Sequence, residues 1–307
     1  MSSNPRMSAP LLVTGAAGGS QGSTGNHVVQ LLAKHGLPVR AVVHRIDERS
    51  DRLQDLGVDL VAGDLLDPDF VGKALKDVKR AYFTFPVDNG LLEATTIFAQ
   101  AAREAGTELV VNMSQLQDAP KAASFRNLQH RLADQIFDWA QVGAVHLNAP
   151  PFFENVRALI AKSVSEQDTI YLPWGNGDAV LPLVSGEDCG RVAAALLLSP
   201  EVPQQKRYTL ISETPRVSEI VSTLSSVLKR PIKYIPITDE RWVEAVRERV
   251  NSHAVDHLSS LWRFFRTAER PKAGPDVGEP IERLIKERPQ TLEEFFRLNV
   301  AAFGGGR

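Results

Sequence analysis

Residues 11–36, LLVTGAAGGSQGSTGNHVVQLLAKHG, decide the fold. An apolar run typical of a strand comes first, and 26–35 have the pattern of a helix. Five glycines stand between them, at positions 15, 18, 19, 22 and 25. Glycine lets backbone N–H groups come close to a pyrophosphate, and the N-terminus of a helix favours negative charge. A glycine-rich turn between a strand and a helix therefore predicts a dinucleotide phosphate loop.

Two other interpretations fit the same turn. Residues 18–22, GGSQG, match the G-x-S-x-G elbow of a hydrolase, with Ser20 as the nucleophile. That elbow follows an internal strand, whereas Ser20 follows the first strand of the chain, and five glycines exceed what one nucleophile needs. A plain flexible loop is the other alternative. The phosphate loop accounts for the glycines best.

The composition excludes several classes of protein. Of the 307 residues, 43% are apolar, so a sizeable core can form. Lys plus Arg number 35 and Asp plus Glu 37, which leaves no electrostatic footprint for nucleic acid. The single cysteine, Cys189, excludes a disulfide framework. No secretory signal and no membrane span are evident, so we expect a cytoplasmic protein.

Short apolar runs alternate with helical patterns through the first half of the chain. Strands are expected at 11–14, 39–43, 58–62, 80–85, 109–113 and 144–147, and helices at 26–35, 70–75, 91–104 and 128–142. This order predicts an α/β fold with a doubly wound parallel (Rossmann) sheet. The expected domains are a flexible tail (1–9), a Rossmann domain (10–150, with 179–212 returning to it), a smaller, mainly helical substrate lobe (151–178 and 213–303) and a tail (304–307).

The end of the second strand predicts which nucleotide binds. A dinucleotide site meets the adenosine ribose there, about twenty residues past the loop, with an acid for a free 2′-hydroxyl or an arginine for a 2′-phosphate. The sequence reads VRAVVHRIDERS, and Arg45 follows the strand. Arg45 favours NADP(H), although NAD(H) stays open and Arg45 also fits a solvated surface charge.

Several stretches together resemble the NmrA-like branch of the atypical short-chain dehydrogenases. They are VTGAAGGSQGSTGNHVVQLL (13–32), GVDLVAGDLLDP (57–68), VVNMSQ (110–115), NLQHRLADQIFDWAQVGAVHLNAPPFFEN (127–155), LPWGNGDAVLPLVSGEDCGRVAAALLLSPE (172–201) and RPQTLEEFFRLNVAAF (288–303). The resemblance implies a Rossmann fold that binds NADPH or NADH. That family includes reductases of quinones and other unsaturated or carbonyl compounds, and redox-sensing regulators that bind the cofactor without turnover.

Carried over residue by residue, the resemblance implies a set of site residues. The pyrophosphate would meet Gly15, Gly19, Gly22, Ser23, Thr24 and Gly25, the 2′-phosphate Arg45, the adenine Asp64 and Leu65, the inner ribose Phe85 and Pro86, and the nicotinamide end Ser114 and His130. The sequence departs from the family at the substrate end. Asn148 and Ala149 replace a common Arg-Pro pair, and Arg131 replaces a common Trp.

The catalytic Tyr-x-x-x-Lys pair of the main short-chain family is absent, because none of the four tyrosines has a lysine four residues later. His130 is the best substitute proton donor, with a pKa suited to exchange near neutrality, and Asp134 one turn later could orient it. His130 also fits a residue that only hydrogen-bonds the cofactor or backbone. Ser114 could anchor a substrate oxygen, and water could protonate a quinone product.

Other candidate residues serve the substrate lobe. Phe152 and Phe153 are placed to form an apolar wall over the nicotinamide. His253 and His257 share a helix face, but they lack the H-E-x-x-H glutamate and a third ligand, so we expect ordinary surface or interlobe residues and no metal site.

These observations predict an NADPH-dependent oxidoreductase that transfers hydride to an apolar carbonyl, enone or quinone. The alternative is a non-catalytic NAD(P)H sensor acting through a partner protein, and a non-redox enzyme on the same fold is a weaker third reading. The expected partner is a small-molecule substrate, without direct nucleic-acid or membrane binding. A homodimer or a regulatory protein partner stays open.

Overall fold

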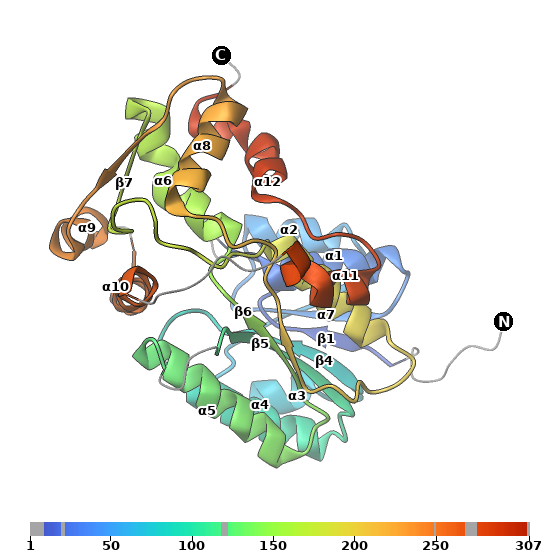
Figure 1. Cartoon of the computed structure of the whole chain (residues 1–307). Coiled ribbons are helices and arrows are strands. Elements are labelled where there is room, and N and C mark those ends of the chain that lie inside the picture. The colour runs from blue at the N-terminus through green and yellow to red at the C-terminus, as the bar shows by residue number, and fades with distance from the viewer. Residues whose placement is uncertain (1–8, 20–21, 118–121, 249, 268–274, 306–307) are drawn as a thin grey trace.

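The computed structural model describes residues 9–19, 22–117, 122–248, 250–267 and 275–305. Seven parallel strands form its main sheet in the order β3-β2-β1-β4-β5-β6-β8 (Figure 1). The strands are β1 (Leu11–Val13), β2 (Val39–Val43), β3 (Asp59–Ala62), β4 (Arg80–Phe83), β5 (Leu109–Gln115), β6 (Val145–Ala149) and β8 (Arg207–Thr209). The predicted doubly wound parallel sheet is confirmed. Ser20, residues 1–8 and residues 306–307 lie outside the described residues.

Helices cover both faces of this sheet (Figure 1). Leu11 and Val13 of β1 face a core shared with α1 (Thr24–Lys34), α7 (Gly186–Leu198) and α11 (Glu279–Ile285). Leu12 points to the opposite core, shared with α3 (Pro68–Ala74), α4 (Leu91–Glu104) and α5 (Phe125–Ala140). This alternation follows from the period of two along a strand, and it explains why β1 is apolar at every position.

β1 and β4 are neighbours near the centre of the sheet. From β1 the chain adds β2 and β3 on one side, and from β4 it adds β5, β6 and β8 on the other, so the direction of the strand order changes between β1 and β4. Val13 pairs with Ala41 of β2 on one side and with Tyr82 of β4 on the other. The Thr14 hydroxyl donates to the Thr84 carbonyl oxygen at 2.9 Å and accepts from the Thr84 N–H at 2.8 Å, so the two strand ends are tied together. A ligand crevice is expected at such a switch point.

A second lobe lies beyond the carboxyl ends of the strands (Figure 1). It contains α6 (Phe153–Gln167), β7 (Thr169–Leu172), α8 (Val217–Leu228), β9 (Lys233–Pro236), α9 (Asp239–Val246), α10 (Ser252–Thr267), α12 (Leu292–Leu298) and the short 3₁₀ helix η3 (Val300–Phe303), whereas the 3₁₀ helix η2 (Pro275–Gly278) leads into α11. Its core includes Trp174 and Trp262, whose ring centroids are 5.4 Å apart.

Two features of the fold were not expected from the sequence. β7 and β9 form a small parallel sheet of their own within the second lobe. The polar segment after β2 contains a short helix, α2 (Glu48–Gln54), which Asp47 caps through the Arg49 N–H at 3.0 Å. None of the described helices is long and apolar enough to cross a bilayer.

Candidate cofactor and substrate site

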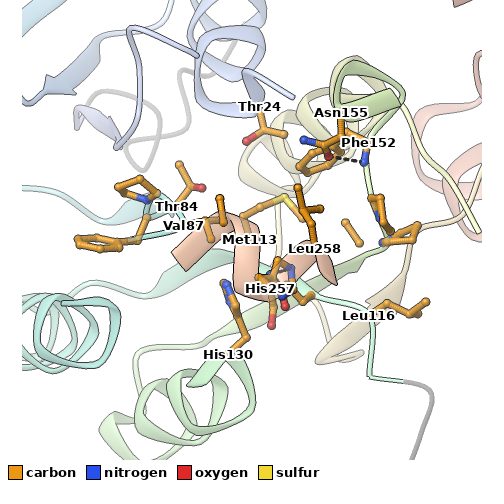
Figure 2. Close-up of a pocket in the computed structure, with 18 of the residues that line it drawn as sticks. Thr24, Thr84, Val87, Met113, Leu116, His130, Phe152, Asn155, His257 and Leu258 are labelled. Atoms are coloured by element: carbon orange, nitrogen blue, oxygen red, sulfur yellow. Dashed lines mark hydrogen bonds between the residues drawn. The ribbon is translucent and has the colours of Figure 1, made fainter. Parts of the chain in front are cut away.

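A pocket of about 440 Å³ lies at the switch point, between the carboxyl ends of the strands and the second lobe. Thr24 of α1 lies on one side of it, His130 of α5 on the opposite side, and α10 crosses between them with His257 and Leu258 (Figure 2). Its lining includes the expected residues Gly15, Gly19, Ser23, Thr24, Gly25, Phe85, Pro86, Ser114, His130 and Phe152. One cavity thus brings together residues from both lobes.

Helix α1 begins at this pocket without a side-chain cap. Ser23 has a left-handed backbone (φ 48°), and its hydroxyl bonds back to Gly19, donating to the carbonyl oxygen at 2.5 Å and accepting from the N–H at 3.1 Å. The first N–H groups of a helix have no partner within the helix. The positive end of α1 is therefore free to receive an anion in the pocket.

The glycines of the loop serve different purposes. A Cβ on Gly25 would lie 2.5 Å from the Thr14 carbonyl oxygen, so Gly25 permits α1 to pack against β1. A Cβ on Gly22 would lie 2.8 Å from the Phe152 ring, which makes Gly22 a packing residue outside the pocket lining. A Cβ on Gly19 would meet no atom of the described residues within 4 Å. Open space above an uncapped helix start fits a diphosphate.

The arginine at the pocket is not the expected one. The Arg45 side chain is 75% exposed and does not line the pocket, whereas Arg49 does. The Arg49 Nη1 lies 3.4 Å from the Gly18 carbonyl oxygen, and its Nη2 donates to Asp47 Oδ2 at 2.6 Å. This hydrogen bond lowers the pKa of Asp47 to about 2. Arg49 is thus fixed beside the glycine loop.

The two expected adenine residues lie outside the pocket lining. Asp64 accepts a hydrogen bond from the Leu66 N–H at 2.9 Å in the turn after β3, next to Leu65.

The loop after β4 is held by Arg126 of α5, which donates to the carbonyl oxygens of Pro86 and of Asp88, the latter at 2.8 Å. That pair of bonds fixes the loop in which Phe85 and Pro86 lie.

His130 lines the pocket, but its protonation differs from the expectation. Burial, together with the nearby Arg126 and His257, holds its pKa well below the ordinary value. Asp134 of the described chain makes no hydrogen bond to His130; its Oδ1 accepts from Asn112 at 2.9 Å and its Oδ2 from Gln117 at 2.7 Å. His130 is therefore neutral near pH 7, and the expected near-neutral pKa is wrong because the side chain is desolvated.

His257 lies in the pocket wall between the two lobes, which matches the interlobe alternative and not the surface one. Its Nδ1 is 2.7 Å from Ser124 Oγ and its Nε2 is 3.1 Å from Gln115 Nε2. If the Gln115 amide N–H donates to Nε2, then Nδ1 carries the proton and donates to Ser124. Burial, with a smaller effect of Arg126, lowers the pKa of His257 to about 3. A neutral imidazole thus joins α10 to the sheet.

Phe152 and Phe153 separate to opposite sides of the start of α6. Phe152 lines the pocket, and its N–H donates to Asn155 Oδ1 at 2.8 Å (Figure 2). Phe153 is 0% exposed and packs in the core of the second lobe, where its ring centroid lies 5.5 Å from that of Phe295. Phe153 thus does not form the expected wall, because the first turn of α6 points it into the lobe.

Some chemistry is missing from the described residues of the pocket. No tyrosine and no lysine belongs to the described lining. Within the described ranges, no group of three His, Cys, Asp or Glu side chains could hold a metal ion.

The Rossmann part of the chain matches a known protein family. Residues 7–136 match the NmrA-like family. The likeness inferred from the glycine loop and from the stretches at 57–68 and 110–115 is thereby confirmed for this part of the chain.

Other similar proteins align with nearly the whole chain. The NAD(P)H azoreductase of Xenophilus azovorans is 24% identical over 296 residues, 93% of this chain and 98% of that protein. An NADPH-dependent quinone oxidoreductase of Escherichia coli, solved with NADPH, aligns with a TM-score of 0.78 and 16% identity, covering 94% of this chain and 99% of its own. The negative transcriptional regulator NmrA, solved with NADP, has a TM-score of 0.75 and 17% identity, covering 95% of each chain.

Proposed function

We propose that this protein is an NADPH-dependent oxidoreductase that transfers hydride to an apolar carbonyl, enone or quinone. The observation that carries the proposal is the uncapped start of α1, which opens beside Gly19 into the same pocket as Ser114 and His130. The names of the azoreductase and of the quinone oxidoreductase support a redox role and a nicotinamide cofactor. The reduced nicotinamide, when bound, supplies the hydride.

The residues divide by the part of the nucleotide they would hold. The N–H groups that begin α1 bind the diphosphate, and Gly19 leaves the room for it. Arg49, which lines the pocket, binds the 2′-phosphate as a charge-assisted donor. Arg45 stays a second prediction for that phosphate, as do Asp64 and Leu65 for the adenine and Phe85 and Pro86 for the ribose.

At the reacting end, Ser114 and His130 act as neutral groups. The Ser114 hydroxyl orients an acceptor oxygen, and the His130 imidazole donates or accepts a hydrogen bond without carrying charge. A quinone needs no dedicated acid, because its reduced oxygen can take a proton from water. This favours an electron-poor acceptor over a simple ketone, which would need a stronger acid in the site.

The test is to mix the purified protein with NADPH and a panel of quinones, enones and aldehydes, and to follow the absorbance of the reduced nicotinamide. We expect consumption with at least one quinone and slower consumption with simple ketones. Ser114→Ala should lower kcat for the accepted substrate while NADPH affinity stays unchanged. NADPH oxidation with none of the acceptors would contradict the enzymatic proposal.

The second candidate is a non-catalytic NAD(P)H sensor that acts through a partner protein. The lack of a tyrosine or lysine in the described lining favours it, as does the likeness to the regulator NmrA. Tight NADPH binding without turnover, and a protein partner recovered in only one redox state of the cofactor, would support this candidate over the enzyme.

A further inference from the structure

Polar side chains lie between β5 and α5, behind the reacting end of the pocket. Side chains alternate between the two faces of a strand, so Val110, Asn112 and Ser114 of β5 point to the same side. Val110 packs in the core that is shared with α5, and α5 packs against β5 (Figure 1). Asn112 is 2% exposed and Ser114 is 3% exposed. The strand thus presents two buried polar groups to α5.

One carboxyl group of α5 connects these polar residues. Asp134 is 1% exposed, and Asn112 Nδ2 donates to its Oδ1 at 2.9 Å. Gln117 Nε2 donates to Asp134 Oδ2 at 2.7 Å and to Ser114 Oγ at 3.3 Å. A buried carboxyl group is costly unless it is hydrogen-bonded, and here both of its oxygens accept a bond. The contacts run from Asp134 through the Gln117 amide to the Ser114 hydroxyl.

The Asp134 carboxylate fixes which end of the Gln117 amide faces Ser114. A carboxylate accepts hydrogen bonds and does not donate them, so the part of the Gln117 amide beside it has to be the NH₂ group. The second proton of that NH₂ group then points to Ser114 Oγ, which accepts it. No described residue accepts a hydrogen bond from the Ser114 hydroxyl. Since Ser114 lines the pocket, its own proton is left for a ligand there.

We propose that Gln117 and Asp134 are positioning residues that hold the Ser114 hydroxyl as a hydrogen-bond donor toward the pocket. The inference rests on the proposed hydride transfer and adds what the substrate presents at Ser114, which is the oxygen of a carbonyl or quinone. This oxygen gains negative charge when hydride arrives from the reduced nicotinamide, and it then takes a proton from water. The bond from Ser114 strengthens as the charge develops, so it lowers the barrier to hydride transfer.

Asp134→Asn tests the direction of the bonds, because it keeps the shape of the side chain and replaces one acceptor by a donor. Asn112 donates to the Oδ1 position, so the new amide keeps its oxygen there and turns its NH₂ group toward Gln117. The Gln117 amide then has to present its oxygen to that NH₂ group, and the same oxygen accepts the proton of Ser114. The Ser114 hydroxyl is thereby turned away from the pocket.

Steady-state kinetics measure the effect, with NADPH and the quinone of the panel that the wild type reduces fastest. Ser114→Ala and Asp134→Asn should each lower kcat roughly 10²-fold, the cost of losing one donor to a developing oxyanion, while KM stays nearly unchanged. The double variant should lose no more than either single variant, because both changes remove the same bond. Additive losses in the double variant, or a wild-type kcat for Asp134→Asn, would overturn the proposal.

Two further variants separate this role from a general effect on the fold. Asp138→Asn is the matched control, because Asp138 belongs to the same helix and bonds to His146 at 3.1 Å and Arg207 at 2.9 Å instead of Gln117, so kcat should stay at the wild-type value. Gln117→Met leaves α5 intact and frees the Ser114 hydroxyl to rotate, so kcat should fall, but less than in Asp134→Asn. A wild-type kcat for Gln117→Met would overturn the proposal even if Asp134→Asn does not fold.

The side-chain amide resonances of Gln117 test the hydrogen bonds without turnover. Both protons are bonded in the wild type, so both should exchange slowly with water. Asp134→Asn should shift them and speed their exchange, whereas Asp138→Asn should do neither. Gln117 resonances that are the same in Asp134→Asn and in the wild type would overturn the positioning role. If the resonances change as expected but no acceptor oxidises NADPH, the proposed hydride transfer fails while the direction of the Ser114 hydroxyl stands.

Discussion

The two ends of the pocket are built in different ways. The proposed phosphate end is built mainly on one continuous segment, the glycine loop and the start of α1, with Arg49 of α2 beside it, and backbone N–H groups and the dipole of α1 would supply most of the binding. The reacting end comes from side chains of β5, α5 and α10, and its Ser124–His257 contact joins residues 133 positions apart. On the proposed function, the phosphate end would therefore bind charge at any pH through local structure, whereas the arrangement of the reacting end depends on how the second lobe packs.

The largest expected effect comes from substitutions at the adjacent residues Phe152 and Phe153. Phe153→Ala should lower the free energy of unfolding by about 3–5 kcal/mol, because it empties a fully buried site beside Phe295. Phe152→Ala should cost less stability, because Phe152 is half-buried at the pocket, and should instead raise KM for an apolar substrate. Urea unfolding of both variants measures the difference. Equal losses of stability would mean that both rings belong to one core.

Acid should weaken the reacting end before the phosphate end. The folded protein holds His257 neutral, with a pKa of about 3, whereas the unfolded chain protonates it near pH 6.5. The unfolded state thus binds more protons between these values, and stability falls as the pH drops through that window. At pH 4.5 the loss from this group is about 2–3 kcal/mol, at 1.36 kcal/mol per pKa unit.

The measurement is the free energy of unfolding of the wild type and of His257→Gln at several pH values. Gln keeps a polar partner for Ser124 but cannot titrate, so the variant should lose less stability between pH 6.5 and pH 4.5. His130 also resists protonation, so part of the acid sensitivity should remain. Parallel curves for the two proteins would show that His257 is not the group that titrates.

A pair of arginines tests the phosphate end. Arg49→Ala should weaken NADPH binding by about 1.5–3 kcal/mol, the range for a hydrogen bond to a charged group, and leave NADH affinity nearly unchanged. Arg45→Ala should have a smaller effect, because its side chain is 75% exposed and outside the pocket lining. Calorimetric titration of both nucleotides separates the two. The reverse order of effects would return the 2′-phosphate to Arg45.

Alanine substitutions at Gly19 and Gly72 should have the smallest effects. Among the described residues, neither glycine has an atom within 4 Å of an added Cβ, and neither has a positive φ, so alanine fits the described fold at both positions. Gly72 lies in α3, outside the pocket lining, whereas Gly19 lines the pocket. Gly19→Ala should therefore weaken NADPH and NADH alike at an unchanged melting temperature, and Gly72→Ala should weaken neither. Unchanged affinity in both variants would mean that the diphosphate does not approach Gly19.

The position of the glycine loop at the pocket could be predicted because its sequence signal is contiguous. A strand, a glycine turn and an amphipathic helix lie within 26 residues, and the alternation of later elements predicted the parallel sheet. Arg49 was missed because α2, with the sequence ERSDRLQ, has too few apolar residues to indicate a helix. The packing of a polar segment against the loop is a tertiary effect.

The reacting end was predicted only in part for a related reason. Ser114 and His130 were expected at the site, and the structure brings both to the pocket. The role of His257 depends on contacts with Ser124 and Gln115, far away in the chain, and nothing local distinguishes it from the exposed His253. The desolvation of His130 and the inward turn of Phe153 likewise depend on the packing between and within the lobes, which local patterns do not encode.

The N–H groups of the first turn of α1 provide the most direct test of the central claim. Amide resonances of Thr24 and Gly25 should shift strongly when NADPH saturates the protein. The first turn of α12, whose Glu294 N–H is already bonded to the Thr291 hydroxyl at 3.2 Å, should not respond. Resonances of Thr24 and Gly25 that stay in place while NADPH binds would show that the diphosphate lies elsewhere, and would contradict the account.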